Sequence, residues 1–424
     1  MSIFEQRESE IRGYCRVYPV VFDTASNARQ KDDQGNEYID FFAGAGVLNF
    51  GHNNERMKRA VIDYIERDGV THHLDMHSTA KQTFMESFAK TILEPRDMPH
   101  KMQFMGPTGT NAVEAALKIA RRATGRTEIV AFTHGFHGMT LGALACTANQ
   151  AFRGAAGVPL NHVSHFPFGA EKHTSDNPLS GGKDVIEQLR VLYRDGSSGF
   201  LPPAAFLVET IQAEGGVNVA DKKWLQDLQA LAREVGALLI LDDIQAGCGR
   251  TGSFFSFDDY DIDPDVICLA KGLGGWGTPI AMNLVKPEVD KHWKPGEHTG
   301  TFRGQALSFV AGNEAIAYFD DASFLQGVRH KGETMLKKVS PLEDKFSKVQ
   351  VRGKGMMLGV DVGSGDNAKQ IVADCFADGL LVAACGSGGR VVKLIPPLTI
   401  PEEDLQTGLA TFVRHVEKVM EAAS

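Results

Sequence analysis

The sequence contains little cysteine and no long apolar run. Its 424 residues include only six cysteines, and none of them forms a Cys-x-x-Cys pair. Scattered cysteines are typical of reduced thiols, so we expect a cytoplasmic protein. No apolar run approaches the roughly 20 residues that a membrane-spanning helix requires. The charged amino-terminal segment also lacks the apolar core of a secretion signal, and we therefore expect no membrane span and no export.

Basic residues are outnumbered by acidic ones. The chain has 44 Lys and Arg against 53 Asp and Glu, which gives a formal net charge of -9. A nucleic-acid-binding surface needs clustered basic residues that replace phosphate counterions, so this balance argues against a nucleic-acid partner. The composition, with 43% hydrophobic and 23% charged residues, is that of a globular protein with small-molecule ligands.

Between about residues 60 and 290, short apolar runs alternate with segments of helical periodicity. This alternation is typical of crossover units around a mostly parallel sheet, so we predict an α/β protein. Ligands of such sheets bind beyond the carboxyl ends of the strands, and the residues that follow each run are candidates for a functional site. The clearest expected strands are residues 128–132, 205–208, 237–241 and 265–269.

The pattern changes after about residue 310, where longer helical segments surround short expected strands near residues 349–362 and 379–398. We predict a large sheet domain over residues 56–305 and a smaller α+β domain over residues 306–424. Residues 1–55 are expected to join the smaller domain.

A lysine ends one of the apolar runs. Lys271 follows residues 265–270 and precedes the turn sequence Gly-Leu-Gly-Gly. At the end of a buried strand, low-dielectric surroundings favour the neutral and nucleophilic amine. Such an amine can hold an aldehyde cofactor as a Schiff base. A solvated lysine at a strand exit is the common alternative, so the interpretation depends on the other residues at this edge.

An acid follows another expected strand. Residues 237–241 lead into the sequence Asp-Asp-Ile-Gln, which begins at Asp242 and lies at the same predicted sheet edge as Lys271. A carboxylate that faces a protonated pyridine nitrogen keeps the ring an electron sink, while a lysine holds the aldehyde at the other end. The two residues therefore predict pyridoxal 5'-phosphate as cofactor. The alternative for Asp242 is a structural role, as the cap of the following turn or the partner of Arg250.

A phosphate also needs a binding site. The sequence Gly-Pro-Thr-Gly-Thr-Asn, from Gly106 to Asn111, precedes apolar residues at helical spacing. The backbone amides of Gly109 and Thr110, at the positive end of this helix, suit a phosphate dianion. We also predict that Asn111 and Glu114 cap the helix reciprocally. The alternative is a turn that only starts a helix.

An aromatic residue follows a third expected strand. Phe136 lies in the sequence His-Gly-Phe-His-Gly, directly after residues 128–132. Its ring is placed to stack on a planar cofactor, with packing inside the loop as the alternative.

Five short motifs follow one another along the chain. They are Gly109-Thr-Asn before a helix, His134-Gly-Phe-His-Gly, Glu209-Thr-Ile-Gln-Ala-Glu-Gly, Asp242-Asp-Ile-Gln-Ala-Gly-Cys-Gly-Arg-Thr-Gly and Lys271-Gly-Leu-Gly-Gly. Their order and spacing resemble those of the class III, or omega, pyridoxal-phosphate aminotransferases. The resemblance covers nearly the whole chain and implies the fold type I architecture.

The resemblance implies a role for each matching residue at the ring end of the cofactor. Lys271 would form the Schiff base and move protons, and Asp242 would face the pyridine nitrogen. Gln245 would lie beside the ring hydroxyl, and Phe136 and His137 would complete the set that binds the ring.

At the phosphate end, the resemblance implies a site shared between two subunits. Gly109 and Thr110 would hold the phosphate of their own subunit's cofactor. Thr301, in the sequence Thr-Gly-Thr-Phe, would reach the phosphate in the neighbouring subunit. The protein is therefore expected to be a homo-oligomer, at least a dimer with shared active sites.

Residues 71–77, 209–216 and 297–304 carry a finer resemblance. They resemble the members of the family that move the amino group of L-glutamate to L-aspartate 4-semialdehyde in ectoine biosynthesis. These two molecules are therefore the expected substrates. Diaminobutyrate enzymes of siderophore pathways share much of the pattern, and enzymes of the ornithine or 4-aminobutyrate type are further alternatives.

One position departs from the family pattern. In the family, an arginine before a Pro-Pro-Leu segment binds the α-carboxylate of glutamate and otherwise pairs with a glutamate that corresponds here to Glu214. Lys393 stands at that position, and a lysine offers a mobile point charge in place of a two-pronged fork. Either Lys393 or Arg390 could bind the carboxylate. Glu209 is a candidate for shaping the cofactor side of the pocket, with a structural salt bridge as the alternative.

Three alternatives fit the sequence less well. Residues 272–277, Gly-Leu-Gly-Gly-Trp-Gly, match the dinucleotide fingerprint of a nicotinamide-dependent oxidoreductase, but an expected strand follows them where the fingerprint requires a helix. His72, His73 and His77 could bind a metal, but they lack the glutamate of the zinc-protease helix motif, and we predict no metal site. A non-catalytic binding protein would not need both Lys271 and Asp242.

Overall fold

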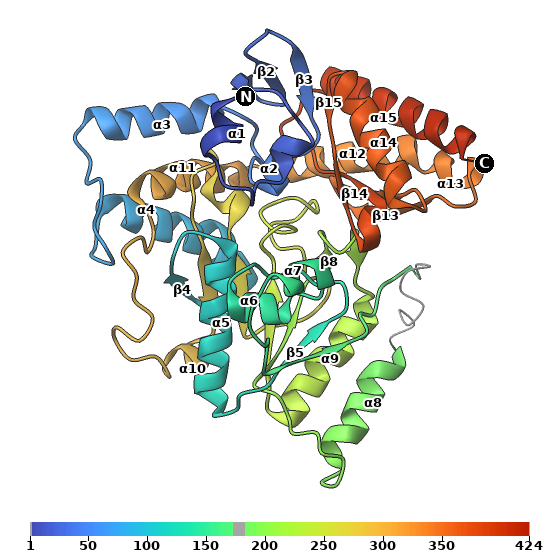
Figure 1. Cartoon of the computed structure of the whole chain (residues 1–424). Helices are drawn as coiled ribbons and strands as arrows, with labels where there is room; N and C mark the ends of the chain where they lie inside the picture. Colours follow the sequence, from blue (N-terminus) through green and yellow to red (C-terminus); the bar gives the residue numbers. More distant parts are fainter. Residues whose placement is uncertain (1, 173–182, 424) are drawn as a thin grey trace.

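A seven-stranded sheet forms the centre of the computed structural model, which describes residues 2–172 and 183–423 (Figure 1). Strands β11, β10, β7, β5 and β6 run parallel, and β12 is antiparallel to both of its neighbours. The prediction of an α/β protein with a mostly parallel sheet is therefore confirmed. In spatial order the strands are β4 (Lys101–Phe104), β12 (Met282–Val285), β11 (Val266–Leu269), β10 (Leu238–Asp242), β7 (Ala205–Val208), β5 (Ile129–Phe132) and β6 (Val163–Phe166).

Helices surround this sheet and form much of the remaining structure (Figure 1). Those in the first half of the chain are α1 (Ile3–Arg7), α2 (Ala43–Gly46), α3 (Glu55–Glu66), α4 (Thr79–Phe88), α5 (Gly109–Thr124), α6 (Leu141–Cys146), α7 (Gln150–Gly154) and α8 (Lys183–Arg194). Those in the second half are α9 (Lys222–Val235), α10 (Pro287–Asp290), α11 (Ala306–Ile316), α12 (Ala322–Val339), α13 (Pro341–Lys345), α14 (Gly365–Ala377) and α15 (Glu402–Ala422).

Both faces of the large sheet are buried. Every residue of β5, β7 and β11 is buried. Successive side chains of a strand point to opposite faces, so Ile240 and Val266 pack with α5, whereas Leu239 and Ile267 pack with Trp224 of α9. Strands that are buried on both faces have continuous apolar runs, which explains why the sequence predicted them.

Two four-stranded sheets include strands from the C-terminal part of the chain. The first is antiparallel, in the order β13 (Gln350–Lys354), β14 (Met357–Asp361), β17 (Val391–Leu394) and β16 (Ala383–Cys385). The second has the order β1 (Phe22–Ser26), β2 (Arg29–Asp32), β3 (Glu37–Asp40) and β15 (Leu380–Leu381).

The N-terminal strands lie with the C-terminal part of the chain. Strand β3 pairs in parallel with β15, and side chains from both ends of the sequence share one apolar core with α12, α14 and α15. The division into domains at 1–55, 56–305 and 306–424, with the first segment joining the smaller domain, stays a prediction.

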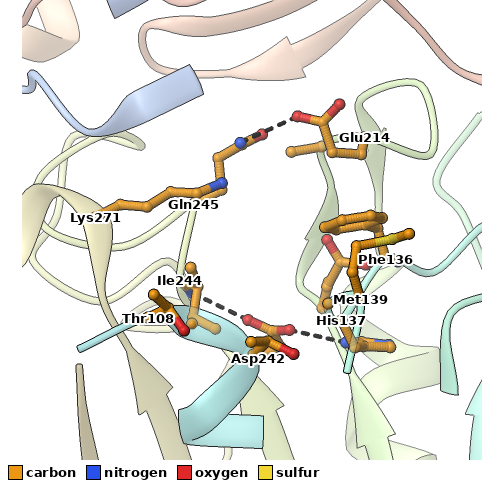
Figure 2. Close-up of a pocket in the computed structure, with 14 residues that line it drawn as sticks. Thr108, Phe136, His137, Met139, Glu214, Asp242, Ile244, Gln245 and Lys271 are labelled. Carbon is orange, nitrogen blue, oxygen red and sulfur yellow. Dashed lines mark hydrogen bonds and ion pairs between the residues drawn. The ribbon is translucent and has the colours of Figure 1, made fainter. Parts of the chain in front are cut away.

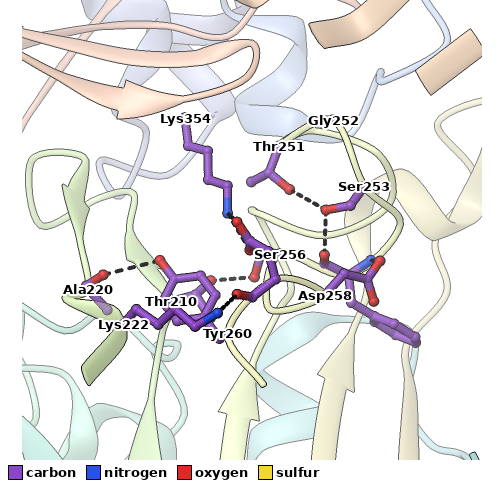
Figure 3. A network of polar contacts seen from close by, with 12 residues as sticks. Thr210, Ala220, Lys222, Thr251, Gly252, Ser253, Ser256, Asp258, Tyr260 and Lys354 are labelled. Carbon is purple, nitrogen blue, oxygen red and sulfur yellow. Dashed lines mark hydrogen bonds and ion pairs between the residues drawn. The ribbon is translucent and has the colours of Figure 1, made fainter. Parts of the chain in front are cut away.

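The segment between β10 and β11 connects the large sheet to the C-terminal part (Figure 3). Lys354 of β13 forms an ion pair with Asp259, with Nζ to oxygen distances of 2.6 and 2.7 Å. The hydroxyl of Tyr260 donates to the carbonyl oxygen of Ala220 at 3.1 Å. The segment is therefore fixed from two sides by contacts that do not involve the sheet edge near Lys271.

Residues 272–277 do not form a dinucleotide-binding turn. They begin within the short 3-10 helix η4 (Lys271–Gly274) and lead into β12, which is antiparallel to β11. The fingerprint requires a turn that opens an α-helix between parallel strands, so the structure does not support the oxidoreductase alternative. Among the residues that the structure describes, no helix combines the length and apolar character needed to cross a bilayer.

Candidate active site

Lys271 lies where the chain leaves β11 and turns into η4. Its φ is +49°, a left-handed conformation that costs a residue with a Cβ about 1–2 kcal/mol. Such strain is concentrated at functional sites, where the surrounding structure maintains it. Among the described residues, Nζ of Lys271 makes no hydrogen bond or ion pair. Burial lowers the pKa of Lys271 to about 8, although the charge of Glu214 opposes the shift, so the neutral amine is accessible near physiological pH.

Asp242 lies at the carboxyl end of the parallel strand next to β11, as predicted. Figure 2 shows its carboxylate between two partners: Oδ2 lies 2.8 Å from Nδ1 of His137, and Oδ1 accepts the backbone N–H of Ile244 at 3.2 Å. Asp242 therefore caps the following turn, as one alternative predicted, and it also faces the pocket. The predicted alternative of a pair with Arg250 is wrong, because that guanidinium donates to two backbone carbonyls and an asparagine.

Two further titratable groups lie around Asp242. Burial disfavours a charged His137, yet the hydrogen bond to Asp242 and the nearby negative charges outweigh it and raise the pKa of His137. Burial raises the pKa of Glu209 to about 8, against the opposing charge of His137. Oε1 of Glu209 accepts the backbone N–H of Phe136 at 3.0 Å, which fixes the loop that carries both the aromatic ring and His137. The side chains of Glu209, His137 and Asp242 therefore form one buried polar group.

The amino end of helix α5 forms another wall. The backbone amides of Gly109 and Thr110 have no hydrogen-bond acceptor within the described residues, as expected for the first turn of a helix. A Cβ at position 109 would lie 3.0 Å from Cδ1 of Ile244, so glycine permits this close approach. Free amides at a positive helix end favour an anion such as phosphate.

The predicted cap of this helix is wrong. The helix starts at Gly109 with Thr108 as its N-cap, and Asn111 lies already within the first turn. Oε1 of Glu114 instead accepts hydrogen bonds from the hydroxyl of Thr140 at 2.6 Å and the N–H of Ala143 at 3.0 Å. Tertiary partners on the neighbouring loop therefore replace the local cap that the sequence indicated.

A buried ion pair closes the opposite end of the site. The ammonium of Lys393, whose side chain is only 1% exposed, donates to the carboxylate of Glu214 and to Oε1 of Gln245 at 3.0 Å. Nε2 of Gln245 in turn donates to Glu214 at 3.1 Å, a contact drawn in Figure 2. Burial alone would raise the pKa of Glu214, but the charges of Lys393 and Lys271 lower it to about 2.

These groups line one cavity of about 280 Å³ (Figure 2). The structure brings together most of the predicted site residues. Those on the wall are Gly109, Thr110, Phe136, His137, Glu209, Glu214, Asp242, Gln245 and Lys271. Lys393 reaches the cavity through Glu214 and Gln245. Thr301 does not line it and lies exposed between α10 and α11.

Other residues on the wall were not predicted. Thr108, Met139 and Ile244 also line the cavity. Thr108 and Ile244 lie within quoted motifs, and Met139 directly follows one. Met139 has no comparable signal, because an exposed methionine after a glycine is equally consistent with a surface loop.

The residues present fit pyridoxal phosphate. Three observations support the fit: an amine at Lys271 and two amides at Gly109 and Thr110 that have no hydrogen-bond partner in the described part of the chain, and a carboxylate at Asp242. They correspond to the three functional ends of the cofactor, namely the aldehyde, the pyridine nitrogen and the phosphate. Among the described residues, no group of three or more His, Cys, Asp or Glu is arranged to hold a metal ion.

Known proteins resemble the chain along its whole length. The family described as "Aminotransferase class-III" matches residues 13–416. A diaminobutyrate--2-oxoglutarate transaminase from Halalkalibacterium halodurans is 46% identical over 423 residues, which cover 99% of this chain and 97% of the relative. An enzyme of the same name from Streptomyces coelicolor is 48% identical over 422 residues, with 99% and 98% covered.

Solved structures agree with this assignment. The ornithine aminotransferase from Toxoplasma gondii, reported with partial occupancy of PLP at its active site, superposes with a TM-score of 0.84 at 25% identity and covers 99% of this chain and 94% of its own. A Bacillus anthracis aminotransferase has a TM-score of 0.85 at 21% identity, with 98% and 97% covered, and supports the fold. The chain therefore belongs to the class III aminotransferases, a family of fold type I enzymes that depend on pyridoxal 5'-phosphate.

Proposed function

We propose that this enzyme transfers the amino group of L-glutamate to L-aspartate 4-semialdehyde, which gives 2-oxoglutarate and L-2,4-diaminobutanoate, the first step of ectoine biosynthesis. The observation that carries the proposal is the buried cluster of Lys393, Glu214 and Gln245 beside Lys271. In this cluster Lys393 can either pair with Glu214 or bind a substrate carboxylate. The names of the curated relatives support the choice of substrates.

Lys271 and Asp242 carry the chemistry in this proposal. When bound, the cofactor supplies an aldehyde that takes up the amino group and a ring that accepts electrons. Nζ of Lys271 removes the proton from the α-carbon of glutamate and delivers it to the cofactor. A pKa near 8 suits an amine that must both accept and donate a proton near neutral pH. Asp242, held by His137, places its carboxyl group at the opposite end of the site.

The remaining cofactor-binding residues hold and orient the cofactor. Gly109 and Thr110 bind the phosphate through their amides, and Phe136 covers the ring from the side of the β5 loop. Thr301 completes the phosphate site of a second subunit, so we propose a homodimer as the active form. Its exposed position in one chain is compatible with that role.

Glutamate binding requires an exchange of partners at Lys393. Without substrate, Glu214 neutralises this lysine, and the α-carboxylate of glutamate takes the place of Glu214 when it enters. The semialdehyde has a hydrogen at that position, so the ion pair can reform during the second half of the reaction. Arg390 is the weaker candidate, because its Nε donates to the buried carboxylate of Asp361 at 2.8 Å. Glu209 shapes the cofactor side of the pocket through its bond to the Phe136 amide.

A coupled assay tests the proposal. The purified enzyme is given L-glutamate with aspartate 4-semialdehyde, succinate semialdehyde or glutamate 5-semialdehyde, and 2-oxoglutarate is measured. We expect the largest kcat/KM with aspartate semialdehyde. A clear preference for succinate or glutamate semialdehyde would assign the enzyme to the 4-aminobutyrate or ornithine type and would contradict the proposal.

The free state of all six cysteines is compatible with the cytoplasmic location that we also propose.

A further inference from the structure

The backbone of α2 (Figure 1) is left-handed. Its four residues, Ala43 to Gly46, all have positive φ values, between +48° and +86°. Glycine adopts this conformation readily, but in an alanine it brings Cβ too close to the following carbonyl oxygen. A run of four such residues that includes two alanines forms only where the surrounding structure holds it. This segment, which we call the left-handed turn, is therefore a strained element that other side chains must stabilise.

Asp40 holds the start of the left-handed turn. This residue is fully buried, and its Oδ1 accepts the backbone N–H groups of Phe42 and Ala43 at 2.8 and 2.7 Å. Its Oδ2 lies 2.9 Å from Nε2 of His52 and accepts a hydrogen bond from Nε2 of Gln30 at 3.0 Å. Hydrogen bonds to a carboxylate are strong, and here they bond both of its oxygens. The carboxylate of Asp40 is therefore fixed in place and stabilises the backbone that follows it.

The left-handed turn presents one backbone carbonyl to the active site. The carbonyl oxygen of Ala45 accepts a hydrogen bond from Nε2 of Gln245 at 2.8 Å. The same nitrogen donates to Glu214 at 3.1 Å (Figure 2), and Oε1 of Gln245 accepts the ammonium of Lys393 at 3.0 Å. A Cβ at position 46 would lie 3.3 Å from Cγ of Gln245, so the turn is packed closely against this side chain.

These partners determine the orientation of the Gln245 amide. A backbone carbonyl can only accept a hydrogen bond and a lysine ammonium can only donate one, so Nε2 must face Ala45 and Oε1 must face Lys393. The contact with Ala45 does not depend on Glu214. It therefore remains when a substrate carboxylate replaces Glu214 at Lys393, and it keeps Oε1 directed at the ammonium in both arrangements.

The backbone next to Asp40 also contacts the chain that carries Lys393. The N–H of Ile395, two residues after Lys393, donates to the carbonyl oxygen of Phe41 at 2.9 Å. Both members of the contact between Gln245 and Lys393 are thus tied to the segment that Asp40 stabilises.

We propose, on the basis of the function proposed above, that Asp40 is a positioning residue for the exchange of partners at Lys393. Asp40 stabilises the left-handed turn, and the turn holds the amide of Gln245 so that Lys393 is directed toward the α-carboxylate of glutamate. Asp40 is not on the wall of the cofactor cavity, so it acts through Gln245.

Single-turnover kinetics of the cofactor-loaded enzyme with L-glutamate alone test the proposal. We expect Asp40→Ala to raise the glutamate concentration that gives half the maximal rate about 3- to 10-fold, the usual effect of losing one hydrogen bond, and to leave the maximal rate nearly unchanged. Asp40→Asn can still accept both N–H groups and should keep most of the affinity. Ala43→Gly together with Ala45→Gly allows positive φ without strain and should restore part of the affinity of Asp40→Ala.

Asp32→Ala is the matched control. Asp32 is also buried, and its Oδ1 also accepts two backbone N–H groups, those of Gln34 and Asn36, at 3.0 and 2.8 Å. It ends β2 in the sheet that contains Asp40, and within the described chain its turn has no hydrogen bond to Gln245. This variant should lose stability and keep the glutamate affinity of the wild type. An equal loss of affinity in Asp32→Ala and Asp40→Ala would overturn the proposal.

A double-mutant cycle with Gln245→Leu tests whether Asp40 acts through Gln245. In the Gln245→Leu enzyme, Asp40→Ala should change the glutamate affinity less than about twofold, because the contact that it supports is already lost. Effects of the two substitutions that multiply would overturn the proposal.

The same cycle, measured by the urea midpoint of the cofactor-loaded enzyme, needs no substrate. The shift caused by Asp40→Ala with Gln245→Leu should be smaller than the sum of the two separate shifts, whereas Asp32→Ala and Gln245→Leu should add. A smaller shift in an enzyme that turns over neither glutamate nor aspartate semialdehyde would reject the proposed function and retain the link between Asp40 and Gln245. Additive shifts would overturn that link whatever the substrate.

Discussion

Asp242 and Asp243 are adjacent at the end of β10, yet they belong to different parts of the molecule. Asp242 faces the cofactor cavity and contacts His137 (Figure 2). Asp243 points to the other side, where Oδ2 accepts the N–H of Ser256 at 3.2 Å and Oδ1 accepts its hydroxyl. Ser256 also contacts the hydroxyl of Thr210, within the network shown in Figure 3.

The difference shows that two adjacent residues at a strand end can have separate roles, one structural and one at the cofactor cavity. Burial raises the pKa of Asp243 to about 8, so near pH 7 this carboxyl group is neutral and serves as a structural hydrogen-bonding group. Asp242 is one residue earlier and is available to a cofactor. Two identical side chains thus take different roles because successive residues of a strand point to opposite faces.

The largest effect that separates the two faces is expected from Asp242→Ala. Loss of a preorganised charge opposite Lys271 should lower kcat roughly 10²- to 10³-fold. The dissociation constant of glutarate, an unreactive acid with both carboxylates of glutamate, should change little, because Asp242 lies at the cofactor end of the site. Steady-state kinetics and glutarate titration measure the two quantities. Similar losses in both would show that Asp242 acts on substrate binding and would remove the distinction.

A smaller effect is expected at the switchable cation. Lys393→Met should raise the KM for L-glutamate about 10- to 100-fold, because one charge-assisted interaction with the α-carboxylate is lost. The half-reaction with the semialdehyde should be affected less, since that substrate has no carboxylate at this position. Single-turnover kinetics of each half-reaction provide the comparison, with Lys393→Arg as the charge-preserving control. A uniform loss in both half-reactions would contradict the exchange of partners.

The pH dependence of cofactor attachment tests the residues that line the cofactor cavity, and not Asp243. The pKa of Lys271 is lowered to about 8, so the fraction of neutral amine increases with pH up to that value. The rate of covalent attachment to the cofactor-free enzyme should therefore rise from pH 6 and level off above about 8. Glu214→Gln removes a charge that favours the ammonium, and it should move the midpoint to lower pH. An unchanged midpoint in this variant would show that Glu214 does not act on Lys271.

On the side of Asp243, we expect pH to change the free energy of unfolding. The pKa of Asp243 is higher in the folded chain than in the unfolded chain, so the folded state binds more protons between about pH 4 and 8 and loses stability as the pH rises through this range. This one group contributes about 1.4 kcal/mol per pH unit to the slope. Asp243→Asn should remove that part of the slope in denaturant titrations between pH 6 and 8. A slope that does not change would mean that Asp243 is ionised.

The smallest effect is expected at the edge of the Figure 3 network. Lys354 is half-buried and Asp259 is exposed, and ion pairs that are open to solvent contribute about 0.2–1 kcal/mol. Lys354→Met should therefore lower the free energy of unfolding by less than about 1 kcal/mol and leave kcat unchanged. A large loss of activity would show that this segment acts on the cofactor side.

Much of the site could be predicted from the sequence because it lies at strand ends. Lys271 and Asp242 follow continuous apolar runs, and parallel neighbouring strands bring such ends together. The cap at Asn111 and Glu114 was wrong because Glu114 found partners on another loop, which local spacing does not reveal.

Some contacts could not be predicted from spacing alone. The opposite directions of Asp242 and Asp243 depend on the register of β10, which two adjacent acids do not determine.

In this enzyme, we infer, the amine of Lys271 carries the cofactor, and Asp242 lies at the far end of the cofactor. Borohydride reduction of the cofactor-loaded enzyme, followed by digestion and mass mapping, tests it most directly. We predict a single pyridoxyl label on the peptide that contains Lys271, and its absence in Lys271→Ala. A label on another lysine of the wild type, or no label at all, would show that Lys271 does not carry the cofactor.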